Sequence, residues 1–281
     1  MVDYGVSPAF IVSLYGPRFS INDFCNGLSI ARRLGFDFYQ PEIFHKDQLE
    51  AWQNGGAEII NQAGSGLGLK ASQFVAHFMH VYFASPKIIQ SDAGLELLRQ
   101  TTGWVHQFDG CKVLTIPTLP LEESDSIRSS EQYDEMQKYL FDKIIACLEI
   151  VENTGLKLAF EIVPFSVIGN IDRFLAICEA IGSAELGLNL DTGHAWATRD
   201  CVHLLPLKIR NRIFGLHLKD NDSNHNQPLA PGRGTIQWKF FLENLAKIGY
   251  LGSLDIEIGC EPERVSDEYS NGLNYLKGIS Q

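Results

Sequence analysis

Four apolar segments in the second half of the sequence end in a side chain that can bind a metal ion. They read Leu-Ala-Phe-Glu161, Leu-Asn-Leu-Asp191, Gly-Leu-His217 and Asp-Ile-Glu257. A charged group that closes an apolar strand is costly to bury unless it is paired or coordinated. If these strands are parallel neighbours, their ends meet and the four side chains can reach one ion. The sequence therefore predicts a single metal site with Glu161, Asp191, His217 and Glu257 as ligands.

The predicted ligands are three carboxylates and one imidazole, an oxygen-rich set with a ligand charge of about −3. Such a set suits Mn²⁺ first, with Mg²⁺, Co²⁺ or Zn²⁺ as alternatives, and the lack of a thiolate argues against a structural zinc. The competing interpretation is that isolated acids end these strands in separate salt bridges. It would explain one or two of the four residues but not the whole set.

The residues that precede each ligand support an inward orientation. Side chains alternate between the two faces of a strand. The positions two residues before the ligands are small or polar, whereas the positions between are apolar. The first set is Ala159, Asn189, Gly215 and Asp255, and the second is Phe160, Leu190, Leu216 and Ile256. Polar positions inside and apolar positions outside are what a barrel with an internal site requires.

Short β-rich runs alternate with longer amphipathic stretches along the chain. The predicted strands are Ala9–Leu14, Phe36–Pro41, Leu69–Ala76, Lys112–Ile116, Leu156–Ile162, Leu186–Asp191, Ile213–Leu218 and Ser253–Ile258. The predicted helices are Ile21–Leu34, Gln48–Ala63, Ala93–Phe108, Ser130–Asn153, Ile171–Ile181, Val202–Asn211, Trp238–Ile248 and Pro262–Leu276. Eight such units in 281 residues average about 35 residues each. The pattern predicts an α/β fold, a closed (β/α)8 barrel of eight parallel strands, as one domain over residues 1–281.

The positions of glycines and of long loops along the chain agree with the predicted barrel. Gly35, Gly64, Gly110 and Gly155 follow predicted helices as C-terminal caps do. The longest predicted loops follow strands three, four and seven, at Phe78–Ser91, Pro117–Arg128 and Lys219–Thr235. All three lie at the carboxyl ends of strands, the face where barrel enzymes place their chemistry.

Composition excludes several classes of protein. No apolar run is long enough to span a membrane, and the N-terminus lacks the layout of a secretory signal. The six cysteines are scattered, which favours reduced thiols and a cytoplasmic location over a disulfide framework. With 23 basic and 34 acidic residues the formal charge is −11, so nucleic acid is not an expected partner.

Five motifs resemble those of the xylose isomerase-like barrels, a superfamily that includes sugar and sugar-phosphate isomerases, epimerases and endonuclease IV. They are Glu161-Ile-Val-Pro, Asp191-Thr-Gly-His194, His217-Leu-Lys-Asp220, Gly232-Arg-Gly234 and Asp255-Ile-Glu257. The motifs run from the fifth predicted strand to the end of the chain. The first half matches only in its strand–helix rhythm.

The resemblance to the ketose 3-epimerases of this superfamily implies roles for Glu161, Glu257 and His194, and strand-end positions add Lys219 and His77 as candidates. Glu161 and Glu257 would bind the metal and also exchange a proton with the substrate carbon beside the carbonyl, through a metal-stabilised enediolate. His194 would contact a substrate oxygen, or alternatively orient Asp191. Lys219 would supply positive charge to the substrate, or alternatively cap the strand or pair with Asp220. His77 closes the third predicted strand and is a further candidate for substrate contact.

Two departures separate the chain from those epimerases. Ser223 stands where they carry an arginine, and Val167 stands where they carry a second acid. Both missing groups help to hold the sugar, so the resemblance does not identify the substrate. Phe165 and Trp196, just beyond strand ends, are candidates for an apolar pocket wall.

The expected function is a divalent-metal-dependent sugar isomerase or epimerase. Its partner would be a small sugar or sugar-derived substrate, with no membrane, and a homo-oligomer is compatible with the resemblance. One alternative is a keto-polyol dehydratase (a lyase) on the same scaffold. A metal-dependent abasic-site endonuclease fits less well, because Asn226, Pro228 and the Thr115–Thr118 segment lack the residues that hold its additional zinc ions.

Overall fold

Short parallel strands alternate with helices throughout residues 3–122 and 127–280, the ranges that the computed structural model describes. The strands are β1 (Tyr4–Val6), β2 (Phe38–Tyr39), β3 (Glu42–Ile43), β4 (Lys70–Ala71), β5 (Phe74–Ala76), β6 (Val113–Thr118), β7 (Lys157–Ile162), β8 (Leu186–Asp191), β9 (Ile213–His217) and β10 (Leu254–Ile256). The α-helices are α1 (Ala9–Tyr15), α2 (Ile21–Leu34), α3 (Leu49–Ala51), α4 (Ala57–Gly66), α5 (Pro86–Ile89), α6 (Leu95–Val105), α7 (Ser130–Glu152), α8 (Ile171–Ile181), α9 (Thr192–Ala197), α10 (Leu205–Ile209), α11 (Trp238–Lys247) and α12 (Val265–Ile279).

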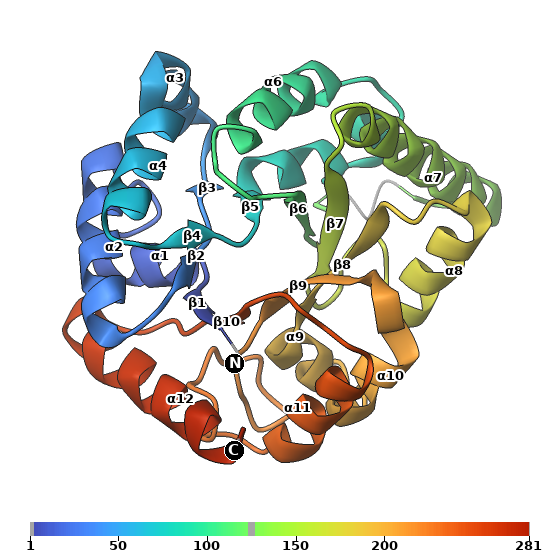
Figure 1. The fold of residues 1–281 in the computed structure, drawn as a ribbon. Helices are drawn as coiled ribbons and strands as arrows, with labels where there is room; N and C mark the ends of the chain where they lie inside the picture. Colours follow the sequence, from blue (N-terminus) through green and yellow to red (C-terminus); the bar gives the residue numbers. More distant parts are fainter. Residues whose placement is uncertain (1–2, 123–126, 281) are drawn as a thin grey trace.

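The strands pair in parallel in two sheets, with the orders β10-β1-β2-β4 and β3-β5-β6-β7-β8-β9. An isolated parallel bridge between Leu218 and Ile256 connects the end of β9 to β10. β2 and β3 belong to one extended segment that is interrupted near Pro41, a residue without an N–H to donate to the ladder. Seen along the axis, the helices surround the strands (Figure 1). The chain has the (β/α)8 barrel fold that its sequence predicts.

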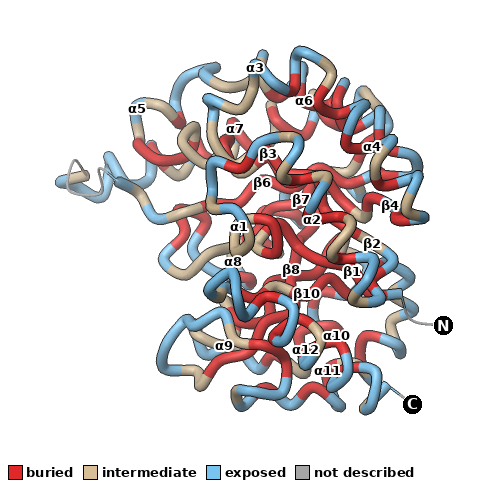
Figure 2. Tube along the Cα trace, turned by 90° about the vertical axis from the view of Figure 1, so that its left-hand side faces the viewer, coloured by how far each residue is buried: buried red, intermediate tan, exposed pale blue. Residues whose placement is uncertain are grey.

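The register brings the carboxyl ends of the strands level. Asp191 pairs with His217 across β8 and β9, and Glu161 pairs with Pro117 across β7 and β6. The most buried segments run through the middle of the molecule, and exposed helix faces and loops surround them (Figure 2). None of the helices in the described ranges is long and apolar enough to cross a membrane.

Local sequence signals set several element bounds. The predictions for α2, α8 and β8 match the observed bounds. In α2, Ser20 and Asp23 form a reciprocal capping box at the start, and Gly35 ends the helix with a φ of 91°. Each of these ends combines a side-chain cap or a glycine with the apolar period, which is why the sequence located it well.

The prediction of a first strand at Ala9–Leu14 is wrong. These residues form α1, with Phe10 and Ile11 buried, and the first strand is the shorter β1. A short apolar run cannot be assigned to strand or helix from its periodicity alone. Pro8 at the N-cap position, followed by Gly16 at a φ of 78°, delimits a two-turn helix instead.

Two smaller expectations are also corrected. Gly64 does not end α4, which continues to Gly66; instead the Tyr39 ring packs where a Cβ of Gly64 would lie, 2.7 Å away. The segment Phe78–Ser91 is not an open loop, because it contains most of a 3₁₀ helix, η3 (His77–Phe83), and α5. Of the expected loop Pro117–Arg128, residues 123–126 lie outside the described residues.

Candidate metal centre

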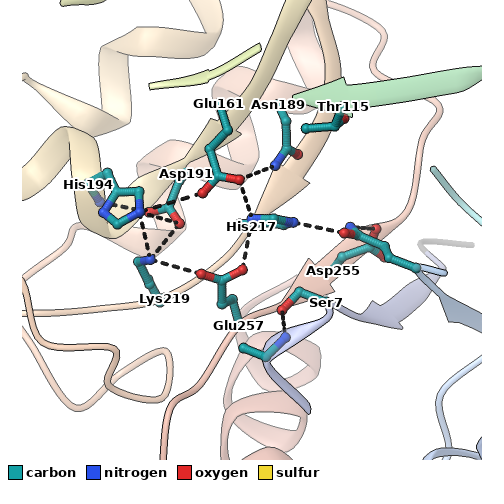
Figure 3. Close-up of polar contacts among 12 residues, drawn as sticks. Ser7, Thr115, Glu161, Asn189, Asp191, His194, His217, Lys219, Asp255 and Glu257 are labelled. Carbon is teal, nitrogen blue, oxygen red and sulfur yellow. Dashed lines mark hydrogen bonds and ion pairs between the residues drawn. The ribbon is translucent and has the colours of Figure 1, made fainter. Parts of the chain in front are cut away.

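The four predicted ligands lie together at the carboxyl ends of β7, β8, β9 and β10. One ligand atom from each of Glu161, Asp191, His217 and Glu257 lies within 4.8 Å of the others. His217 is central, with its Nδ1 at 3.3 Å from Glu161 Oε2 and 2.8 Å from Glu257 Oε2. The two glutamates approach it from opposite sides (Figure 3).

Lys219 and His194 complete this cluster. The Lys219 ammonium lies 2.7 Å from Asp191 Oδ2 and donates a hydrogen bond of 2.9 Å to Glu257 Oε1. His194 Nε2 lies 3.5 Å from Glu161 Oε1 and 3.2 Å from Lys219 Nζ. Lys219 therefore pairs with the predicted ligands and not with Asp220. The ring of His194 faces the cluster, where it can contact a substrate or orient Asp191.

The charges in the cluster shift one another's protonation. Burial alone would raise the pKa of Glu161 and of Glu257, but His217, together with His194 at Glu161 and Lys219 at Glu257, holds the pKa of both carboxyl groups well below its usual range. Burial would lower the pKa of His217, yet the two glutamates raise it well above its usual value. Burial raises the pKa of Asp191. A metal ion must compete with a proton for the imidazole of this site.

The donor atoms fit a divalent cation. Asp191 Oδ2 and His217 Nδ1 are buried and make no hydrogen bond of normal geometry with any residue that the structure describes, although each lies at ion-pair distance from an opposite charge. The other ring nitrogen of His217 donates to Gln40 Oε1 at 2.8 Å, an arrangement that turns Nδ1 toward the carboxylates. The three carboxylates and this imidazole are a donor set typical of Mn²⁺, Mg²⁺ or Zn²⁺.

Buried polar side chains in the interior of the barrel support the predicted metal ligands through hydrogen bonds. Gln40 Nε2 donates to Asp255 Oδ2 at 2.6 Å, and Ser72 donates to the same oxygen at 2.7 Å. On the other side, Asn189 Nδ2 donates to Glu161 Oε2 at 3.4 Å, and Asn189 Oδ1 accepts from Gln73 Nε2 at 2.8 Å. Asn189 and Asp255 thus take the inward orientation that the alternating pattern predicts. Gln40 and Gln73 have no signal in the sequence that identifies them.

Asp220 holds the loop that follows β9. Its carboxylate accepts hydrogen bonds from the backbone N–H groups of Gly232 and Ile236 and from the indole N–H of Trp238, at 3.0, 3.1 and 2.8 Å. A Cβ on Gly234 would lie 2.3 Å from Asp220 Oδ1, so only glycine fits there. The Gly232-Arg-Gly234 motif therefore wraps around Asp220 and fixes the segment that carries Lys219.

The cluster opens into a cavity of about 300 Å³. We call Glu161, Asp191, His217, Lys219 and Glu257 the charged wall; all of these except Asp191 line the cavity. Other lining residues come from the first half of the barrel, and we call Glu42, Phe44, Val75 and His77 the β3–β5 wall. Helix α1, which the sequence did not predict, also lines the cavity, through Ala9, Val12 and its N-cap residue Pro8.

His77 lies where the sequence places it. Its ring stacks on Phe44 with centroids 4.0 Å apart, and it lines the same cavity as the charged wall. Burial lowers the pKa of His77 to about 4, so the imidazole is neutral at pH 7. Its Nδ1 is buried without a hydrogen-bond partner among the described residues.

Sequence reasoning missed Glu42 and misplaced two aromatic residues. Glu42 follows Pro41, where the predicted second strand ends, so the strand pattern does not identify Glu42 as a site residue. The available signal was an acid closing an apolar strand, as at Glu161. Phe165 and Trp196 do not line the cavity: Phe165 is 87% exposed, and the Trp196 indole donates to Thr235.

Comparisons with known proteins agree with this architecture. The family model described as xylose isomerase-like TIM barrel matches residues 28–279. An inosose isomerase from Halalkalibacterium halodurans is 23% identical over 171 residues, covering 58% of this chain and 59% of that protein. The matched stretches span from 42% to 59% of the length of the curated relatives.

Two solved structures share the fold over nearly the whole chain. A D-allulose 3-epimerase from Methylomonas sp. in complex with D-allulose has a TM-score of 0.75 at 17% identity, covering 99% of this chain and 97% of that one. The IOLI protein with a binding zinc atom has a TM-score of 0.71 at 16% identity, covering 99% and 96%. At these identities the likeness concerns the fold.

Proposed function

Because this chain belongs to the xylose isomerase-like TIM barrel family, we propose that it is a divalent-metal-dependent sugar isomerase or epimerase. The observation that carries the proposal is the convergence of three carboxylates, an imidazole and an ammonium group in one cavity. The inosose isomerase and the D-allulose 3-epimerase among its relatives support the same class of reaction. The proposed substrate is a small sugar or a sugar-derived ketone.

In this proposal Glu161, Asp191, His217 and Glu257 hold one divalent cation, with Mn²⁺ as the first choice. When bound, such a cation supplies a Lewis acid for the substrate carbonyl. His217 is already oriented for this role by Gln40, and Glu161 by Asn189. Lys219 balances part of the carboxylate charge and lies where it can reach a substrate oxygen.

The proton transfer falls to the two glutamates. Glu161 and Glu257 flank His217 from opposite sides, so a substrate carbon between them presents one face to each carboxylate. One carboxylate removes the proton from the carbon beside the carbonyl, and the other returns a proton to the enediolate. His194 faces the same space and is proposed to hold a substrate oxygen.

The test is solvent exchange. The protein is incubated in D₂O with a panel of ketoses, separately with Mn²⁺, Mg²⁺, Co²⁺ and Zn²⁺, and deuterium is followed by NMR at the carbon beside the carbonyl. We expect incorporation without loss of water. Formation of an absorbing enone-type product would instead indicate the dehydratase. If no member of the panel exchanges with any of the four metals, the proposal is wrong.

A further inference from the structure

The β3–β5 wall contains a buried acid that the proposed reaction does not use. Glu42 is 2% exposed, and its Oε2 has no hydrogen-bond partner among the described residues. Its carboxyl group does not belong to the candidate metal centre, whose four ligand atoms from Glu161, Asp191, His217 and Glu257 lie within 4.8 Å of one another. A buried polar group without a partner costs about 1–3 kcal/mol in a folded protein, and more when it is charged. The position of Glu42 therefore requires an explanation outside the packing of the barrel.

The same wall contains a second polar atom without a partner. Glu42 and Val75 pair in register across β3 and β5, and His77 follows β5 directly. His77 Nδ1 is buried without a hydrogen-bond partner in the described part of the chain, and the His77 ring stacks on Phe44. Both side chains line the cavity that the charged wall also lines. Two polar atoms without a hydrogen-bond partner among the described residues, Glu42 Oε2 and His77 Nδ1, thus lie on one side of this cavity, while the groups on the other side lie at ion-pair distance from one another.

The chemistry of the two groups selects a ligand group. A carboxyl group and a neutral imidazole both bond to a hydroxyl, which can donate and accept. An anion such as phosphate would gain nothing from Glu42, and Glu161 and Glu257 already make this cavity acidic. A hydroxyl satisfies both orphan atoms without adding charge.

We propose that Glu42, with His77 beside it, forms a subsite for a hydroxyl group of the substrate chain remote from the metal centre. This proposal rests on the proposed function, because it assumes a polyhydroxy ketone with its carbonyl end at the charged wall. The subsite supplies hydrogen-bonding groups for the substrate from β3 and from the residue that follows β5. The resemblance would place such groups at the positions of Val167 and Ser223, which carry no charge here.

The first test compares ligands of different length. Binding of D-fructose, D-tagatose and dihydroxyacetone to the Mn²⁺-loaded protein is measured by calorimetry for wild type, Glu42→Gln and Glu42→Leu. Dihydroxyacetone has a carbonyl and adjacent hydroxyls but no remote ones. We expect Glu42→Leu to bind the hexuloses about 10- to 100-fold more weakly, the loss of one strong hydrogen bond. Dihydroxyacetone should bind all three proteins within about twofold.

The second test needs no ligand. Since Glu42 Oε2 has no hydrogen-bond partner within residues 3–122 and 127–280, Glu42→Leu should keep or raise the Tm, as often occurs when a polar binding group is removed. The control is Glu268→Leu: this equally buried acid pairs with Arg233 and Arg264, so its loss should lower the Tm. A fall in Tm for Glu42→Leu as large as for the control would assign Glu42 a structural role and overturn the subsite.

The outcomes separate the subsite from the reaction. Hexulose binding that depends on Glu42 but gives no deuterium exchange would overturn the proposed reaction and leave the subsite in place. If the wild type catalyses deuterium exchange but Glu42→Leu binds the hexuloses as tightly as wild type does, the subsite is overturned and the proposed reaction stands. Wild type that binds none of the three ketones, or a Glu42→Leu variant that loses dihydroxyacetone equally, would overturn the subsite.

Discussion

The two sides of the cavity treat their polar groups differently. On the charged wall, each carboxylate lies within ion-pair distance of His217, Lys219 or His194. On the β3–β5 wall, Glu42 Oε2 and His77 Nδ1 have no partner among the described residues. The strands differ as well: β7 and β8 have six residues each, whereas β3 has two and β5 has three.

This difference indicates that the two walls have different roles, one in stability and metal binding and the other in ligand binding. On the charged wall, the longer strands β7, β8 and β9 and the three-residue β10 position several charged groups, and the charges stabilise one another. Short strands interrupted near Pro41 leave polar groups whose partners must come from a ligand. Removing a group from the charged wall should therefore harm the protein itself, whereas removing one from the β3–β5 wall should harm only ligand binding.

The largest effect is expected on the proton carriers. Glu161→Gln or Glu257→Gln should reduce deuterium exchange by about 10²- to 10⁴-fold, the usual contribution of a general base, while metal binding is at least partly retained. Exchange is followed by NMR and metal content by elemental analysis. Glu149→Gln, an exposed position on α7, is the control. Full activity in either site variant would contradict the two-base assignment.

Lys219→Met should be the most destabilising of the changes. It leaves Asp191 and Glu257 without the ammonium group that both contact, and breaking a buried ion pair in this way costs about 3–5 kcal/mol. Chemical denaturation measures the loss. In the control Lys157→Met, the exposed pair with Glu185 should cost no more than about 1 kcal/mol. Equal losses in the two variants would remove the contrast between the walls.

Metal binding should stabilise the protein through the charged wall alone. Mn²⁺ at about 100 times its Kd adds about 2.7 kcal/mol, or roughly 5–10 °C in Tm, and a chelator should reverse the shift. The shift should vanish in His217→Ala and persist in Glu42→Leu, because Glu42 is outside the ligand group. A shift that depends on Glu42 would place the acid among the ligands and end the distinction between the walls.

The last prediction concerns the pH dependence of stability. The pKa of His77 is about 4 in the folded protein against 6.5 for a free histidine. The unfolded chain therefore binds the extra proton between these values, and stability that is complete above pH 6.5 declines as the pH falls toward 4. The decline should be smaller in His77→Phe by up to about 3 kcal/mol, measured by denaturation across this range. A parallel decline in both proteins would exclude His77 as its source.

The sequence alone determined the barrel and four members of the charged wall, but not the pairing of Lys219. Glu161, Asp191, His217 and Glu257 each close an apolar strand, and the period of two assigns Asn189 and Asp255 to the interior. These are local patterns that the parallel register converts into proximity. Helix ends with a cap or a glycine, as at Ser20 and Gly35, could be located for the same reason.

Only the tertiary structure decided the rest. Helix α1 replaced a predicted strand because a short apolar run carries no distinct period. Glu42 is singled out by its burial and by the lack of a hydrogen-bond partner for its Oε2 among the described residues, and neither property can be read from the sequence. Gln40 supports His217 across 177 positions of sequence. Contacts of this kind depend on how the strands close around the axis, so no local pattern could have specified them.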